Sequence, residues 1–133
     1  MSFRDMAEDG GRLMEMSGFI HEIVEEGVSF LEAVSFTFED TGTVYLRVNP
    51  DEDSFLWECD APQGRKKIEL EILFPKVSTA YGLHVIWSWQ MKNQQGYFDA
   101  LQISLNGALS NNEIILQFLA IGSAIKLFEV TKM

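Results

Sequence analysis

Residues 83–105 read Leu-His-Val-Ile-Trp-Ser-Trp-Gln-Met-Lys-Asn-Gln-Gln-Gly-Tyr-Phe-Asp-Ala-Leu-Gln-Ile-Ser-Leu, and this stretch specifies a β-hairpin. Its turn is the tetrapeptide Asn-Gln-Gln-Gly at 93–96. Asn favours the first position of a type I turn, and Gly tolerates the positive φ of the bulge that follows. A three-residue loop of this kind pairs Asn93 with Tyr97, so the turn also predicts the register of the two strands.

Counting outward from the turn predicts four further cross-strand pairs. These pairs are Met91–Asp99, Trp89–Leu101, Trp87–Ile103 and Val85–Leu105. Directly opposed residues share one face of a ribbon, so this face is almost wholly apolar and the other is mostly polar. Alternation and turn chemistry therefore favour the same hairpin.

A second β region precedes the hairpin and is typical of a meander. Apolar residues alternate over 34–38 and 44–48, and the loop between them ends in Gly42, for which we expect a positive φ. A third strand over 54–59 then places Cys59, the only cysteine, on the same apolar face. We expect Cys59 to be a small core residue, and a single cysteine forms no intramolecular disulfide.

Three segments are compatible with more than one structure. Residues 12–26 have apolar residues at helical spacing, which favours a helix, although residues 19–24 also fit a strand. Residues 68–74 fit either a short strand or a helical turn. Residues 113–121 are apolar on both faces, which favours a central strand covered on both sides over a helix.

These elements predict an α+β fold for one domain over residues 1–133. The sheet is expected to be a mostly antiparallel β meander of about seven or eight strands. We expect it to be a curled sheet or a partly open barrel, with one N-terminal helix covering a face. Residues 1–11, which contain Gly10 and Gly11, are expected to be a loosely ordered leader.

Charge is unevenly distributed in this chain of net charge −10. Residues 1–60 hold 15 Asp/Glu and 3 Lys/Arg, whereas residues 61–133 hold 5 and 7. An acidic surface disfavours nucleic acid, which needs a basic footprint, and favours a basic protein as partner. The alternative is that the charge only keeps the protein soluble. The candidate acidic surface comprises Glu25, Glu26, Asp51, Glu52 and Asp53.

Features of targeting and of catalysis are absent from the sequence. The first residues are acidic, and no segment approaches 18 uncharged apolar residues, so we expect a cytoplasmic protein with no membrane partner. The sequence has no phosphate-binding glycine loop, nucleophile elbow, Cys-x-x-Cys or His-x-x-x-His. His21 and His84 are far apart in sequence. We therefore expect no metal and no cofactor, and a non-enzymatic role is favoured.

One polar group follows from the predicted register. Asp99 is expected on the apolar face near the turn, with Trp89, Asn93 and Tyr97 beside it. A carboxylate there is costly unless it is hydrogen-bonded. It either bonds the turn amides or the Tyr97 hydroxyl, or it belongs to a small polar pocket floored by indole rings that binds a ligand or a partner's side chain.

Residues 87–101 fit the pattern W-x-W-x-x-x-N-Q-Q-G-Y-x-D-A-L. This run resembles one found in a family of small bacterial proteins of unknown function. The resemblance covers about a tenth of the chain. It implies a bacterial single-domain protein and brings no assigned activity.

Two functions from different classes remain open. The first is a non-enzymatic protein-binding module of the small acidic immunity or inhibitor kind, acting through its acidic N-terminal half. The second is a small-molecule-binding or enzymatic domain with a site around Trp89, Asn93, Tyr97 and Asp99. Whether the protein self-associates is left open by the sequence.

Overall fold

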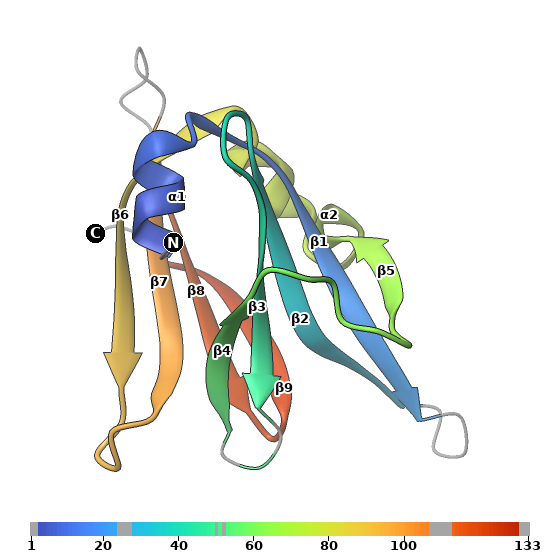
Figure 1. Cartoon of the computed structure of the whole chain (residues 1–133). Helices are drawn as coiled ribbons and strands as arrows, with labels where there is room; N and C mark the ends of the chain where they lie inside the picture. Colours follow the sequence, from blue (N-terminus) through green and yellow to red (C-terminus); the bar gives the residue numbers. More distant parts are fainter. Residues whose placement is uncertain (1–2, 24–27, 50, 52, 107–112, 131–133) are drawn as a thin grey trace.

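A computed structural model shows that the described residues fold around a nine-stranded antiparallel sheet (Figure 1). The structure describes residues 3–23, 28–49, 51, 53–106 and 113–130. Among these residues the elements, in chain order, are α1 (Phe3–Asp9), β1 (Arg12–Ile23), β2 (Val28–Phe38), β3 (Gly42–Asn49), β4 (Ser54–Glu58), β5 (Lys66–Glu69), α2 (Leu70–Leu73), the 3₁₀-helix η1 (Pro75–Ala80), β6 (Leu83–Lys92), β7 (Phe98–Asn106), β8 (Glu113–Ile121) and β9 (Ala124–Val130).

The sheet consists of two halves joined at one short pairing. Its strand order is β4-β3-β2-β1-β6-β7-β8-β9, and β5 also pairs with β1. β1 and β6 pair only at Arg12–His84 and Leu13–Leu83, and below this point the two halves separate (Figure 1). The sheet is therefore curled but not closed. The expectation of a mostly antiparallel sheet with an N-terminal helix is confirmed, and the described part of the chain has nine strands instead of seven or eight.

Aromatic side chains from both halves meet in the core. The ring of Phe36 on β2 lies 5.5 Å from that of Phe118 on β8, and Phe55 on β4 lies 5.3 Å from Phe98 on β7. These contacts bury the inner faces of the two halves against each other, which is how a curled sheet removes its apolar face from water.

The N-terminal helix lies earlier in the chain than expected. Residues 1–11 are not a loose leader, because Phe3–Asp9 form α1 and Phe3, 1% exposed, stacks on Trp57 at 4.7 Å. Of the predicted helix over 12–26, Arg12–Ile23 form strand β1 instead, and 24–26 lie outside the described residues. β1 pairs along both edges, and these backbone hydrogen bonds outweigh the helical spacing of its apolar residues.

The other two ambiguous segments are resolved differently. Residues 68–74 contain the end of β5 and all of α2, so each alternative applies to part of the segment. Residues 113–121 form strand β8, not a helix. β8 is not central, since only the edge strand β9 lies beyond it, and one face is left partly open, with Ile121 50% exposed.

The central hairpin has the predicted turn but a different register. Gly42 and Gly96 have φ of +88° and +84°, and the Asn93 amide donates to the Tyr97 carbonyl at 2.9 Å, all as expected. However, Trp89 pairs with Gln102 instead of Leu101. Trp89 and Leu101 consequently lie on opposite faces, 58% and 0% exposed, and the predicted register is wrong between the turn and Trp87.

Two β-bulges cause this difference. The pairing shifts once between Met91 and Lys92, where Asp99 is the extra residue on β7, and again next to Ile86 on β6. The second bulge restores the predicted pair Val85–Leu105. A bulge adds one residue to one strand and reverses the faces of the residues beyond it, which turns both Trp87 and Trp89 away from the core.

Cys59 is exposed, so its predicted core position is also wrong. β4 ends at Glu58, one residue before it.

Candidate functional site

Of the four residues of the predicted polar pocket, Asn93 and Tyr97 contact each other through the turn. Asn93 Oδ1 accepts hydrogen bonds from the Gln95 and Tyr97 amides at 2.9 and 3.2 Å, so Asn93 stabilises the turn. Trp89 packs against Trp87 in a tilted arrangement, with ring centroids 4.5 Å apart. A hollow beside β6 is lined by Trp89 and by Arg4, Ala7 and Glu8 of α1, and Asn93, Tyr97 and Asp99 are not among its lining residues.

Asp99 is a half-buried bulge residue, and Met91, its predicted partner, pairs with Ala100 instead. Ligand binding at these four residues stays a prediction.

The candidate acidic surface is only partly described. Glu25, Glu26 and Glu52 lie outside the described residues. Asp51 and Asp53 are exposed, and Asp53 Oδ1 accepts a hydrogen bond of 2.7 Å from the Ser123 amide. Asp53 therefore has a structural role, because it ties the β3–β4 loop to the β8–β9 turn.

The arginines of the first 60 residues neutralise part of the acidic charge. Each pairs with a glutamate: Arg4–Glu8 at 3.0 Å, Arg12–Glu39 at 2.7 Å and Arg47–Glu58 at 3.4 Å. These pairs are largely solvent-exposed, so each contributes little to stability. They nevertheless reduce the density of unpaired acidic groups on this half.

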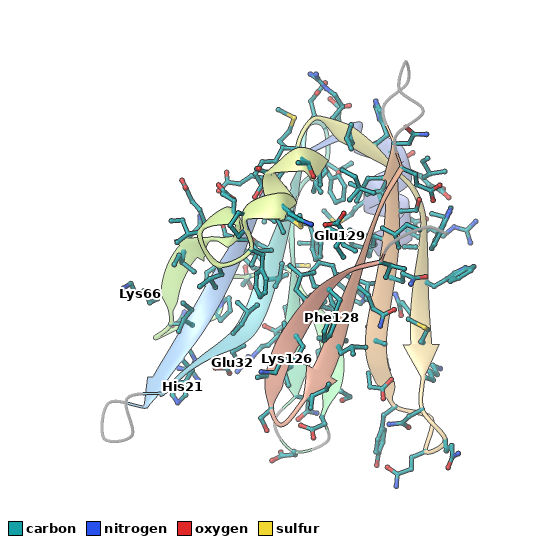
Figure 2. The ribbon with its side chains drawn as sticks, turned by 180° about the vertical axis from the view of Figure 1, so that it is seen from behind. His21, Glu32, Lys66, Lys126, Phe128 and Glu129 are labelled. Atoms are coloured by element: carbon teal, nitrogen blue, oxygen red, sulfur yellow. The ribbon has the colours of Figure 1, made fainter. Side chains whose placement is uncertain are left out.

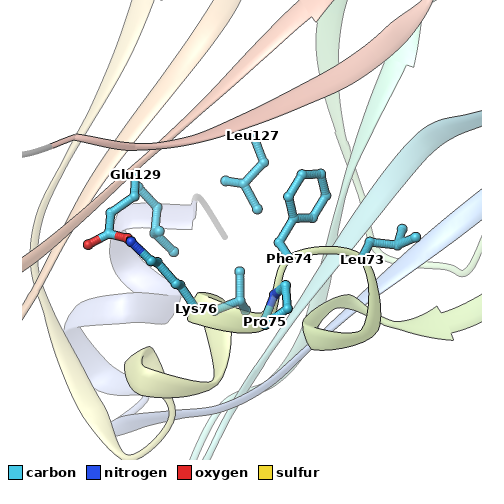
Figure 3. A pocket seen from close by; sticks show the side chains of 8 residues that line it. Leu73, Phe74, Pro75, Lys76, Leu127 and Glu129 are labelled. Atoms are coloured by element: carbon cyan, nitrogen blue, oxygen red, sulfur yellow. The ribbon is translucent and has the colours of Figure 1, made fainter.

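A pocket of about 320 Å³ lies between the α2–η1 segment and strands β8 and β9 (Figure 3). Pro75 begins η1 directly after Phe74, and η1 buries Val77 and Ala80. The walls of the pocket are mostly apolar. At the pocket, Lys76 Nζ and Glu129 Oε2 form an ion pair of 3.6 Å (Figure 3). The lining residues are Leu73, Phe74, Pro75, Lys76, Val77, Leu116, Leu127 and Glu129.

A second hollow of about 370 Å³ adjoins the first and shares three of its residues, Leu73, Phe74 and Leu127. It is lined on one side by Ile20 and Leu31 and on the other by residues 124–128 of β9. We refer to the two together as the β9 groove. Figure 2 shows Lys126, Phe128 and Glu129 along β9 from behind.

The chemistry of the β9 groove is that of an apolar channel beside a free strand edge. β9 is the last strand of the sheet and, within the described part of the chain, pairs only with β8. A strand edge presents unpaired N–H and C=O groups that can hydrogen-bond another extended chain. The sequence predicted the apolar segments around the groove, but not that they would face one another.

Tyr81 is a titratable group whose hydroxyl lies among several hydrogen-bonding partners. Its hydroxyl accepts a hydrogen bond from the Met16 amide at 3.2 Å and lies 2.5 Å from Glu71 Oε2 and 3.1 Å from the Met16 carbonyl oxygen. Burial, and next the hydrogen bond to Glu71, raise the pKa of Tyr81 well above its ordinary value. The raised pKa favours the neutral hydroxyl, which is the form that makes these hydrogen bonds.

No group of three or more His, Cys, Asp or Glu side chains among the described residues is placed to hold a metal ion. In the same residues, no helix has both the length and the apolar character needed to cross a membrane.

Comparison with known proteins identifies a family but no activity. No curated protein matches the chain, and no solved structure does. A family model matches residues 5–133, nearly the whole chain. The chain therefore belongs to the family described as "Family of unknown function (DUF6334)".

Proposed function

We propose that the protein is a non-enzymatic binding module that holds an extended segment of a partner protein in the β9 groove. The observation that carries this proposal is that the groove follows five consecutive residues, 124–128, of an edge strand. Strand addition to a free sheet edge is a common mode of peptide recognition. The main chain supplies affinity and the alternate side chains supply specificity.

The geometry of the groove suggests what the segment looks like. Five residues of extended chain span about 17 Å. Every second side chain of such a segment points toward the apolar wall formed by Leu73, Phe74 and Ile20. We therefore expect apolar residues at alternating positions, each contributing about 1.5 to 3 kcal/mol when fully buried. Ordering of the segment offsets much of this gain, so the affinity of a short peptide should be modest.

The charge of the protein suggests a basic partner. A chain of net charge −10 attracts cations at long range, which increases the association rate at low salt. Charges more than about 8 Å apart are largely screened at physiological ionic strength. A basic segment should therefore bind faster than an acidic one of the same apolar pattern, and the difference should shrink as salt is added.

A small apolar molecule is the second candidate occupant. The pocket in Figure 3, at about 320 Å³, lies at the lower end of the 300–1,000 Å³ range of ligand sites. Lys76 could hold an acidic group of such a molecule by exchanging its partner Glu129. A small molecule would bind without using the free strand edge of β9, whereas an extended segment would require that edge.

A matched pair of variants tests the proposal. The probe is a fluorescent, end-capped Val-Lys-Val-Lys-Val-Lys-Val peptide. Leu73→Gln places an amide in the groove and should weaken peptide binding at least about tenfold, because a desolvated polar group costs more than 1.4 kcal/mol. The control is Leu56→Gln on β4, since Leu56 is 45% exposed and Leu73 40%. Equal affinities for the two variants in fluorescence anisotropy would reject the groove as the site.

A further inference from the structure

The outer face of strands β6–β9 is a second, independent surface. This face lies opposite the core and is defined by three rows of paired residues. The rows are Trp87–Ser104–Ile115–Val130, Trp89–Gln102–Gln117–Phe128 and Met91–Ala100–Leu119–Lys126. Trp87 and Trp89 share this face because of the two bulges described above.

The outer face is apolar and poor in charge. Lys126 is the only charged residue in the three rows, although 23% of the chain is charged. Trp89 is 58% exposed and Phe128 49% exposed. The two central glutamines bond each other, with Gln102 Nε2 donating to Gln117 Oε1 at 3.1 Å. Aromatic and Met enrichment with charge depletion is the composition of an interface core.

We propose that a second copy of this chain packs on the outer face, about a two-fold axis parallel to the strands and passing between β7 and β8. Such an axis reverses the strand order, so β6 of one copy faces β9 of the other. The central row is then its own complement: Trp89 meets the partner's Phe128, and Gln102 meets the partner's Gln117. A two-fold interface requires this self-complementarity.

The other two rows fit the same axis. Trp87 meets the partner's Val130, and Met91 meets the partner's Lys126, whose aliphatic stem can cover the thioether. No row brings two like charges together across the interface.

The available area is near the lower limit for association. The four strands are 7 to 10 residues long, so they extend beyond the three rows. At a spacing of about 4.8 Å they cover about 500 Å² as a flat patch. Two copies therefore bury about 1,000 Å² before side-chain relief is counted, close to the lower limit of specific interfaces. The net charge of −10 on each copy opposes association. Salt screens this repulsion, so the dimer should become tighter as ionic strength rises.

The inference is independent of the proposed function. Two residues, Lys126 and Phe128, belong both to the β9 groove and to the outer face. Trp89 belongs to the outer face alone and lies three strands away from β9. A monomeric protein that still binds peptide would overturn the dimer and leave the groove proposal standing.

Sedimentation velocity with charged variants tests the dimer. The native protein should sediment as a dimer, Trp89→Glu and Phe128→Lys should each be monomeric, and Leu56→Glu should remain dimeric. Mixing the first two variants should restore a dimer, because the introduced glutamate then opposes the introduced lysine at one of the two Trp–Phe contacts. A two-fold axis perpendicular to the strands would instead place Trp89 against the partner's Trp89 and Phe128 against the partner's Phe128. Mixing the two variants would then not restore the dimer.

A monomeric native protein, dimeric single variants or the absence of rescue would each overturn the proposal. Melting curves establish that the variants are folded. If either is not, dilution of the native protein replaces the rescue experiment: tryptophan emission should shift to longer wavelength as the dimer dissociates and Trp89 becomes hydrated. Emission independent of concentration would also overturn the proposal.

Discussion

The hydroxyl of Tyr81 occupies the gap between β5 and β6 along the edge of β1, where it contacts both backbone groups of Met16. The distances are 3.2 Å to the amide nitrogen and 3.1 Å to the carbonyl oxygen. β5 covers residues 17–20 of β1, and β6 covers residues 12–13. A side chain thus replaces the missing strand at Met16, and the continuity of the edge depends on one hydroxyl group.

Tyr81→Phe should lower the free energy of unfolding by about 1 to 3 kcal/mol, because it leaves the Met16 amide without its hydrogen-bond acceptor. The ring itself is retained, so packing should change little. Urea denaturation followed by circular dichroism measures the difference. A loss no greater than that of Tyr97→Phe, at an exposed turn position, would contradict the role assigned to the hydroxyl.

The same residue predicts an alkaline loss of stability. The pKa of Tyr81 is raised in the folded protein above the ordinary value of about 10. Above pH 10 the unfolded chain therefore releases a proton that the folded chain retains, and stability falls with rising pH. Below pH 10 both states are protonated and the contribution is constant. The loss of stability above pH 10 should be smaller in Tyr81→Phe. Identical stability–pH profiles for the native protein and the variant would contradict the role assigned to Tyr81.

Phe3→Ala should cost about 3 to 5 kcal/mol, because it removes a buried ring from the core. Phe3 stacks on Trp57 and lies edge-on to Phe36 and Phe38, 5.2 and 5.8 Å away. Met14→Ala, at a position 43% exposed, is the control. Thermal unfolding of the two variants decides whether α1 belongs to the core. Equal melting temperatures would mean that α1 is not packed as described.

The stability of the protein should depend on the hydrogen-bond acceptor of Asp53 and not on its charge. It has a positive φ of 49°, which Asp and Asn tolerate better than Ala, and it accepts a hydrogen bond from the Ser123 amide. Asp53→Asn should therefore be nearly neutral, whereas Asp53→Ala should lose about 1 kcal/mol. Chemical denaturation of both variants is the measurement. The opposite ranking would point to charge as the important property.

The sequence predicted turns better than registers and helices. Asn93 and Gly96 encode local conformations, and these were recovered. The bulge at Asp99 has no local signal in the sequence comparable to that of the turn. Residues 12–23 were wrongly predicted as a helix, because spacing alone cannot show that β2, β5 and β6 all pair with them.

The candidate sites were less predictable than the fold. The predicted pocket at Asp99 depended on a register in which Met91 pairs with Asp99, whereas Met91 pairs with Ala100 in the structure. The β9 groove joins Phe74 to residues about 50 positions later, and only tertiary folding brings them together. The Phe74-Pro75 pair, an apolar ring fixed at the start of η1, is the one local signal that points to it.

The binding of an extended segment beside β9 is tested most directly by nuclear magnetic resonance of the ¹⁵N-labelled protein. On addition of the Val-Lys peptide, the amides of residues 124–128 should shift, and amides on the free edge of β9 should become protected from hydrogen exchange. A peptide with proline in place of its second valine lacks one N–H and should bind much more weakly. Shifts confined to residues 93–97, or equal binding of the proline peptide, would contradict strand addition at β9.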